Sequence, residues 1–180
     1  MDLYGGESPL TIPTRPPYSA RRNATGRQAL AELRRLLGLL RADDNRITLA
    51  PQPGLVRLPE LVDQVRAAGA PVELTLHGSP SALSPGLDLT AYRIIQEALT
   101  NVVKHAGCSP TRIAIIYRPR RLELVVEDDG PSQSAGDGAG HGLVGMRERV
   151  ALYAGALTVG PRDGGGFTVR ASLPIEEPAA

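Results

Sequence analysis

The stretch GLDLTAYRIIQEALTNVVKH, residues 86–105, carries the strongest helical pattern in the chain and predicts a long helix that stops at Gly107. At about 100° per residue, Glu97, Asn101 and Lys104 fall at roughly 0°, 40° and −20°, so they share one narrow face. The opposite side gathers the apolar and aromatic residues Ala91, Tyr92, Ile95, Leu99, Val102 and Val103. We therefore predict a helix that packs its apolar side on a sheet and presents a carboxylate, an amide and an amine together.

The polar face of this helix has two interpretations. It can be an ordinary solvated surface, which is what most such stripes are. Asparagine, however, is a poor helix former, and an amide oxygen beside a carboxylate suits Mg²⁺, which takes hard oxygen ligands. Lys104 and His105, at the end of the same helix, can meet phosphate oxygens. Periodicity alone leaves both interpretations open.

The rest of the chain alternates helical and extended patterns. A helix is predicted from Pro59 to Gly69, followed by a half-buried strand in which Val72, Leu74 and Leu76 alternate with polar residues that include His77. Two strands at 111–119 and 121–130, a short helix at 143–155, and two more strands at 156–161 and 166–174 follow. This order predicts a two-layer α/β sandwich with a mixed sheet and helices on one face.

The segment VVEDDG, residues 125–130, ends an apolar strand in two aspartates and a glycine. A carboxylate at a strand end can accept a hydrogen bond from an exocyclic amine, and Gly130 permits a close backbone approach. An ordinary turn is the plainer interpretation of these letters.

The segment GAGHGLVG, residues 138–145, matches the dinucleotide-binding spelling G-x-G-x-x-G from Gly140 onward. That fingerprint requires a strand immediately before the glycines and an acidic residue about 20 positions later. Here the loop PSQSAGDGA precedes Gly140, and Asp163, about 18 residues beyond Gly145, falls in a hairpin turn. We reject the dinucleotide interpretation and retain the general one, a helix N-terminus that favours phosphate.

Three segments together resemble a known family. YRIIQEALTNVVKHAG (92–107), DDG (128–130) and GHGLVGMRERV (140–150) resemble the N, G1 and G2 boxes of sensor histidine kinases in the GHKL, or Bergerat-fold, ATPase superfamily. The resemblance covers roughly residues 24–175 and is closest to the subfamily paired with response regulators that carry helix-turn-helix domains. It implies the Bergerat fold, ATP and Mg²⁺ as ligands, and transfer of the γ-phosphoryl group to a histidine for relay to a response regulator.

The resemblance also implies roles for individual residues. Asn101 would ligate Mg²⁺, and Glu97 would act as general base or orient the attacking imidazole. Asp128 would accept the adenine amino group, with Gly130 giving access to the ring, and residues 131–141 would form a lid. The contacts implied near the phosphates are Lys104, His105, Gly140, His141, Gly142 and Leu143.

The sequence departs from the family pattern in the G1 box and in the last glycine run. Ser132 stands where a second G1 glycine is usual, and Phe167 stands where many relatives have threonine. For this reason we assign no binding role to Thr168.

No histidine is left for the family's phospho-acceptor, because His77 lies on a predicted strand and His105 and His141 belong to the boxes. Residues 25–41 resemble the end of a dimerisation helix, whose leucines at 30, 33, 37 and 40 follow coiled-coil spacing. We therefore expect a Pro-rich tail (1–22), a dimerisation remnant (23–41), a linker (42–57), an ATP-binding domain (58–175) and a tail (176–180). The remnant would pair with a second copy or with a full-length kinase.

Two other functions fit the same residues. Without an acceptor histidine, the chain could be a non-catalytic ATP-binding regulatory module, or it could be a serine kinase of the anti-sigma type. A net charge of +1 gives no electrostatic case for nucleic acid or membrane binding, and the chain contains no apolar run of 18 residues. A single cysteine, Cys108, fits a cytoplasmic location, and a parent protein could still be anchored in a membrane.

Overall fold

The structure is a computed structural model that describes residues 52–106, 109–131 and 140–175. The predicted dimerisation helix at 25–41, most of the predicted lid and Cys108 lie outside these residues. A single turn of 3-10 helix, η2 (Leu55–Arg57), directly precedes helix α2 (Leu58–Ala67). The Leu55 N–H donates a hydrogen bond of 2.9 Å to Oδ1 of Asp88, so η2 is anchored to the first turn of the long helix that contains Asp88.

The sheet has five strands in the order β1-β2-β3-β5-β4. Their bounds are Val72–His77 for β1, Thr111–Arg118 for β2, Arg121–Asp128 for β3, Ala156–Pro161 for β4 and Phe167–Pro174 for β5. Strands β1 and β2 run parallel, while the pairs β2–β3, β3–β5 and β4–β5 are antiparallel. The predicted mixed sheet is confirmed.

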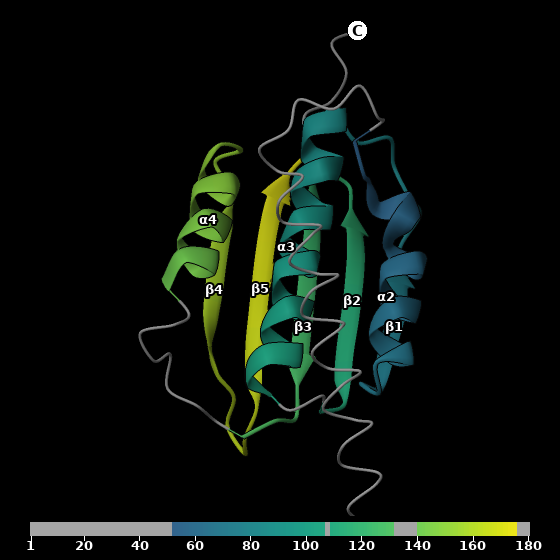
Figure 1. The fold of residues 1–180 in the computed structure, drawn as a ribbon. Coiled ribbons are helices and arrows are strands. Elements are labelled where there is room, and N and C mark those ends of the chain that lie inside the picture. The colour runs from purple at the N-terminus through teal and green to yellow at the C-terminus, as the bar shows by residue number, and fades with distance from the viewer. Residues whose placement is uncertain (1–51, 107–108, 132–139, 176–180) are drawn as a thin grey trace, which may run out of the picture.

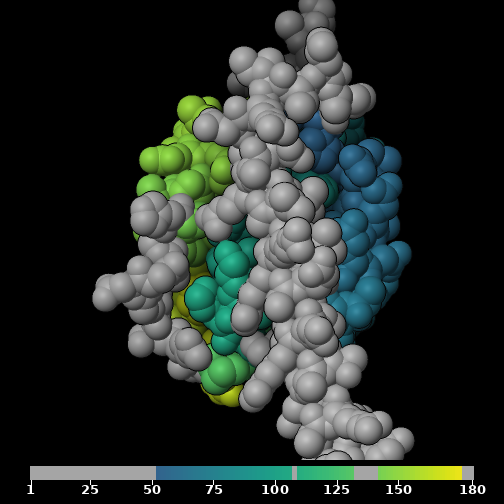
Figure 2. All heavy atoms as spheres, in the orientation of Figure 1, coloured from purple at the N-terminus to yellow at the C-terminus, as the bar shows by residue number. Residues whose placement is uncertain are grey.

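Among the described residues, three α-helices cover one face of this sheet: α2 (Leu58–Ala67), α3 (Pro85–His105) and α4 (Gly140–Ala151) (Figure 1). Helix α3 lies over the middle of the sheet (Figure 1), and the space-filling view shows it between α4 and α2 (Figure 2). The core between the two layers is aliphatic and takes inward-facing strand residues such as Ile113, Leu122 and Leu124, which are at most 1% exposed. The predicted two-layer sandwich is therefore confirmed.

Helix α3 has the orientation that its sequence predicts. It starts one residue before the predicted start, where Ser84 caps it by accepting a hydrogen bond from the Leu87 N–H. Glu97 and Asn101 are half-buried and Lys104 is exposed. All six residues of the predicted apolar side are buried: Ala91, Tyr92, Ile95, Leu99, Val102 and Val103.

The predicted burial of β1 is wrong at its end. Val72 is buried and Leu74 half-buried, but Leu76 is 58% exposed. Strand β1 is an edge strand that pairs only with β2, so Leu76 has strand neighbours on one side only. Alternation in the sequence gives the direction of a side chain, whereas coverage depends on what packs over it.

The second face of the sheet carries no helix in the described part of the chain and is charged at one end. Alternation places Arg112 of β2, Glu127 of β3 and Arg170 of β5 on this face, opposite to the buried residues of the same strands. Arg170 donates to Oε1 of Glu127 across the β3–β5 pair at 2.8 Å. We call this surface the open face of the sheet.

Candidate functional site

The three segments that carry the family resemblance come together along the C-terminal half of α3. The C-terminal end of α3, the end of β3 and the turn between β4 and β5 lie at the lower end of Figure 1, and α4 begins higher up, beside the middle of α3. Glycines mark the contacts between them. A Cβ atom on Gly130 would meet Ala106, one on Gly142 would meet Glu97, and one on Gly166 would meet the carbonyl of Asp128.

Asp128 is buried because it continues the inward alternation of β3 after Leu122, Leu124 and Val126. It is 6% exposed and is the one buried charged residue in the described part of the chain. Its Oδ1 accepts a hydrogen bond of 2.8 Å from the Gly130 N–H. A carboxylate has about four acceptor positions, so this bond leaves room for a further donor. The strand therefore ends in a buried acceptor.

Gly130 lies in a confined space beside this carboxylate. A Cβ atom there would lie 2.6 Å from the Ala106 Cβ and 2.8 Å from Asp128 Oδ1, both closer than real carbon contacts. Only glycine fits, because the turn after β3 packs directly on Ala106, the residue that follows α3. The sequence predicted that Gly130 allows close approach, but not that Ala106 is the group approached.

Helix α4 brings Gly142 onto the polar face of α3. A Cβ atom on Gly142 would fall on Oε1 of Glu97 and lie 2.9 Å from its Cδ. The helix begins at Gly140, three residues before the predicted start, so the glycines form its first turn rather than a preceding loop. Packing against α3 outweighs the low helix propensity of glycine, which is a weak local preference.

The other predicted site residues lie on the C-terminal half of α3 and in the first turn of α4. Asn101 is half-buried, one turn beyond Glu97 on α3, and Lys104 and His105 are exposed in the last turn. Leu143 is 9% exposed and belongs to the hydrophobic core, so only its backbone can serve a ligand. Gly140 and His141 lie in the first turn of α4.

Asp129, next to the buried aspartate, points to the open face and is held by two arginines. Arg112 of β2 donates to both carboxylate oxygens at 2.7 and 3.1 Å, and Arg162 donates to Oδ1 at 2.8 Å. The hydrogen bonds from Arg112 and then from Arg162 lower the pKa of Asp129 below its usual value. Sequence reasoning missed both arginines, because they lie 17 and 33 residues away in the chain.

This pairing predicts a pH dependence of stability. A lowered pKa in the folded state stabilises the protein above the pKa of the unfolded chain, and this contribution is lost as the pH falls through the folded value. We expect Asp129→Asn to lower the melting temperature at pH 6 and to have a steadily smaller effect below about pH 4. Thermal unfolding from pH 2 to 6 measures this. A difference between the two proteins that does not change with pH would contradict it.

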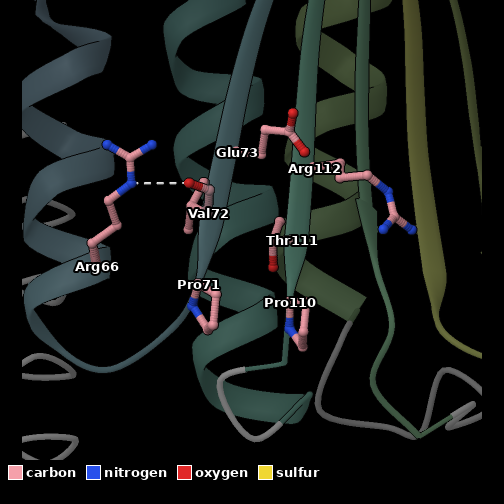
Figure 3. A pocket seen from close by; sticks show the side chains of 7 residues that line it. All are labelled: Arg66, Pro71, Val72, Glu73, Pro110, Thr111 and Arg112. Atoms are coloured by element: carbon pink, nitrogen blue, oxygen red, sulfur yellow. Dashed lines mark hydrogen bonds between the residues drawn. The ribbon is translucent and has the colours of Figure 1, made fainter.

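A separate cleft of about 380 Å³ lies at the start of β1 and β2 (Figure 3). Its two lining arginines already have partners: Arg66 donates to the Val72 carbonyl at 2.9 Å and to Asp63, and Arg112 binds Asp129. Arg66 and Arg112 come from opposite sides in Figure 3, and none of the predicted ATP-contacting residues lines the cleft. We assign it no ligand.

Comparisons with known proteins identify the family of this chain. The family described as histidine kinase-, DNA gyrase B- and HSP90-like ATPases matches residues 86–177 of the 180-residue chain. The histidine-protein kinase/phosphatase UhpB of Salmonella typhimurium is 40% identical over 147 residues, which is 79% of this chain. The sensor histidine kinase YxjM of Bacillus subtilis is 32% identical over 155 residues, 84% of this chain. The chain spans 28% and 36% of the lengths of these two relatives.

Solved structures show the same fold. The histidine kinase AdeS of Acinetobacter baumannii superposes with a TM-score of 0.55 at 16% identity, over 91% of this chain and 88% of that one. Full-length ShkA in complex with AMPPNP gives 0.53 at 22% identity, over 90% of this chain and 39% of that one. In the described residues, no helix is long and apolar enough to cross a membrane. The chain belongs to the family of histidine kinase-, DNA gyrase B- and HSP90-like ATPases.

Proposed function

We propose that this chain is the catalytic domain of a sensor histidine kinase and binds Mg·ATP between the C-terminal half of α3, the end of β3 and the N-terminus of α4. The observation that carries the proposal is the buried carboxylate of Asp128, which has acceptor capacity left and stands beside the contact of Gly130 with Ala106. The amino group of adenine is a donor that suits this acceptor. The first turn of α4 offers backbone N–H groups and the positive end of a helix dipole to the phosphates.

The residues present fit a magnesium ion. The described part of the chain has no group of three or more His, Cys, Asp or Glu side chains that could hold a metal by themselves. Mg²⁺ bound with nucleotides needs no such cage, because it takes one or two protein oxygens and completes its shell with phosphates and water. The half-buried amide of Asn101 would supply that oxygen, with Glu97 one turn away. When bound, the ion would neutralise charge on the phosphates.

The proposed reaction moves the γ-phosphoryl group from ATP to a ring nitrogen of a histidine, with ADP as the leaving group. Glu97 would accept the N–H on the other ring nitrogen and so orient the attacking imidazole. Lys104 and His105 would lie near the phosphates and contribute positive charge or hydrogen bonds. The histidine would come from a dimerisation helix of a second copy or of a full-length kinase, paired through residues 25–41. Transfer to a response regulator with a helix-turn-helix domain would follow in the cytoplasm.

Calorimetric titration of the whole chain with Mg²⁺ and the non-hydrolysable analogue AMPPNP tests the site. We expect saturable binding to one site and about tenfold weaker binding for Asn101→Ala, because an oxygen ligand of the metal is lost. His77→Ala serves as the control, since His77 is exposed at the end of β1. A folded chain without saturable binding would contradict the proposal. Labelling with γ-labelled ATP then distinguishes a histidine kinase from a serine kinase. The label on phosphohistidine is lost in acid, whereas the label on phosphoserine is kept.

The contact between Gly142 and Glu97 gives a second test of the chemistry. Gly142→Ala must displace the Glu97 carboxylate, so we expect transfer to an added histidine-bearing dimerisation fragment to slow by about tenfold or more. The free energy of unfolding should change by no more than about 1 kcal/mol in either direction, since alanine favours a helix over glycine. Gly145→Ala in the same helix is the matched control, because its Cβ would meet only the flexible end of Arg149 at 3.3 Å. Equal rates for the two variants would contradict a role for this contact.

A further inference from the structure

We propose that Arg162 is a positioning residue for nucleotide binding, which fixes the main chain at Asp128 so that the buried carboxylate faces the adenine amino group. This inference rests on the proposed function and adds to it a residue outside the three boxes. Arg162 follows β4 in the turn to β5, 34 residues beyond Asp128. Nothing in the local sequence around Asp128 points to it.

One guanidinium contacts three consecutive residues at the end of β3. Arg162 Nη1 donates to the Asp128 carbonyl at 3.1 Å and to Asp129 Oδ1 at 2.8 Å. Its Nη2 lies 3.8 Å from Oε2 of Glu127. The side chain is only 26% exposed, so these bonds are partly shielded from water. The guanidinium is planar and rigid. Its contacts to two separate oxygens therefore fix the backbone more firmly than the flexible ammonium group of a lysine would.

Other contacts hold the same backbone from two further directions. Arg112 binds the Asp129 carboxylate from β2, and the Asp129 N–H donates to the Pro110 carbonyl at 3.0 Å. Gly166, in the turn that contains Arg162, packs directly on the Asp128 carbonyl. The Arg162 N–H in turn donates to the Gly166 carbonyl at 3.0 Å, so side chain and turn form one unit. The β4–β5 turn therefore supports the back of the adenine site.

The expected effect of Arg162 is on binding more than on stability. Ion pairs near the surface contribute little to folding, whereas a binding group must be held within about 0.5 Å of its productive position. Arg170 offers the matched control, since it donates to Glu127 at 2.8 Å on the same open face. It makes no described hydrogen bond to Asp128 or Asp129.

Titration of three variants with two ligands tests the role. We expect Arg162→Ala to bind Mg·AMPPNP about tenfold more weakly, or ~1.4 kcal/mol, and to bind Mg²⁺-tripolyphosphate as the unmodified chain does. Arg162→Lys should recover part of the loss, because an ammonium still reaches one oxygen. Arg170→Ala should bind both ligands normally. Normal nucleotide binding by Arg162→Ala, or an equal loss for tripolyphosphate, would overturn the inference.

Hydrogen exchange in the nucleotide-free chain keeps this test separate from the proposed function. Arg162→Ala should speed exchange at the N–H groups of Asp129 and Gly130, which bond to Pro110 and Asp128, and Arg170→Ala should leave them unchanged. If the unmodified chain binds no nucleotide, the proposed function fails, and Arg162 then has no role in nucleotide binding either. If the chain binds nucleotide while both amides exchange equally in all variants, only the inference fails.

Discussion

Replacing Asp128 with alanine is expected to weaken binding of Mg·AMPPNP by about 100-fold, or ~2.7 kcal/mol. The variant removes the one buried carboxylate in the described part of the chain, and the adenine amino group would enter the site without an acceptor. A hydrogen bond to a charged group contributes about 1.5–3 kcal/mol, and an unpaired buried donor adds its own cost. Asp128→Asn, which keeps an acceptor oxygen, should lose less, about tenfold. Calorimetric titration measures both constants.

Two controls make this result specific to adenine. Asp163→Ala removes an exposed aspartate from the β4–β5 turn and should bind the nucleotide normally. Tripolyphosphate lacks the base and should bind the Asp128→Ala variant as it binds the unmodified chain. Because Asp128 also accepts the Gly130 N–H, thermal unfolding must show that the variant is folded at the titration temperature. A nucleotide affinity that survives the alanine substitution would reject the assignment of Asp128 to adenine.

Gly166→Ala is expected to lower the free energy of unfolding by at least ~3 kcal/mol, the largest stability change predicted for this domain. Gly166 has a φ of +86°, where a Cβ atom is unfavourable, and that atom would fall on the Asp128 carbonyl oxygen. The strain of a positive φ alone costs about 1–2 kcal/mol. The collision with backbone adds to it, since the β3–β5 pairing holds the carbonyl in place. Urea unfolding measures the loss.

Gly164→Ala separates the two contributions. Gly164 lies in the same turn with a φ of +89°, but a Cβ atom there would have nothing within 4 Å. Its alanine variant should lose only the cost of the positive φ, about 1–2 kcal/mol. The difference between the two variants then reports the contact of the turn with Asp128. Equal losses would mean that the turn does not press on the end of β3.

The sequence predicted the elements that depend on local patterns. The faces of α3 followed from a period of 3.6 residues, so the common side of Glu97, Asn101 and Lys104 needed no tertiary information. The sequence placed Asp128 at the end of an apolar strand, and the structure added that it continues the inward alternation of β3. The order of helices and strands, read with the three boxes, was enough for the two-layer sandwich and the family.

Other features depended on contacts between distant segments. The early start of α4 at Gly140 reflects packing of Gly142 on Glu97, and local helix propensity does not predict this contact. Leu76 matched a buried pattern but stands on an edge strand that leaves it exposed. The two arginines that hold Asp129 come from β2 and from the turn after β4, and no motif spacing links them to the DDG segment.

The sequence by itself determined the helical and extended segments and the candidate residues that they carry, because helical period, strand alternation and glycine placement act over a few residues. Only the tertiary structure decided how they are held. It placed Ala106 against Gly130, and Arg162 and Gly166 behind Asp128. The physical reason is that such contacts arise when strands far apart in the chain pair in one sheet, and their register is set by the burial of the whole core. The acceptor proposed for adenine lies in a short segment that the family resemblance singles out, whereas its supporting contacts come from residues far away in the chain.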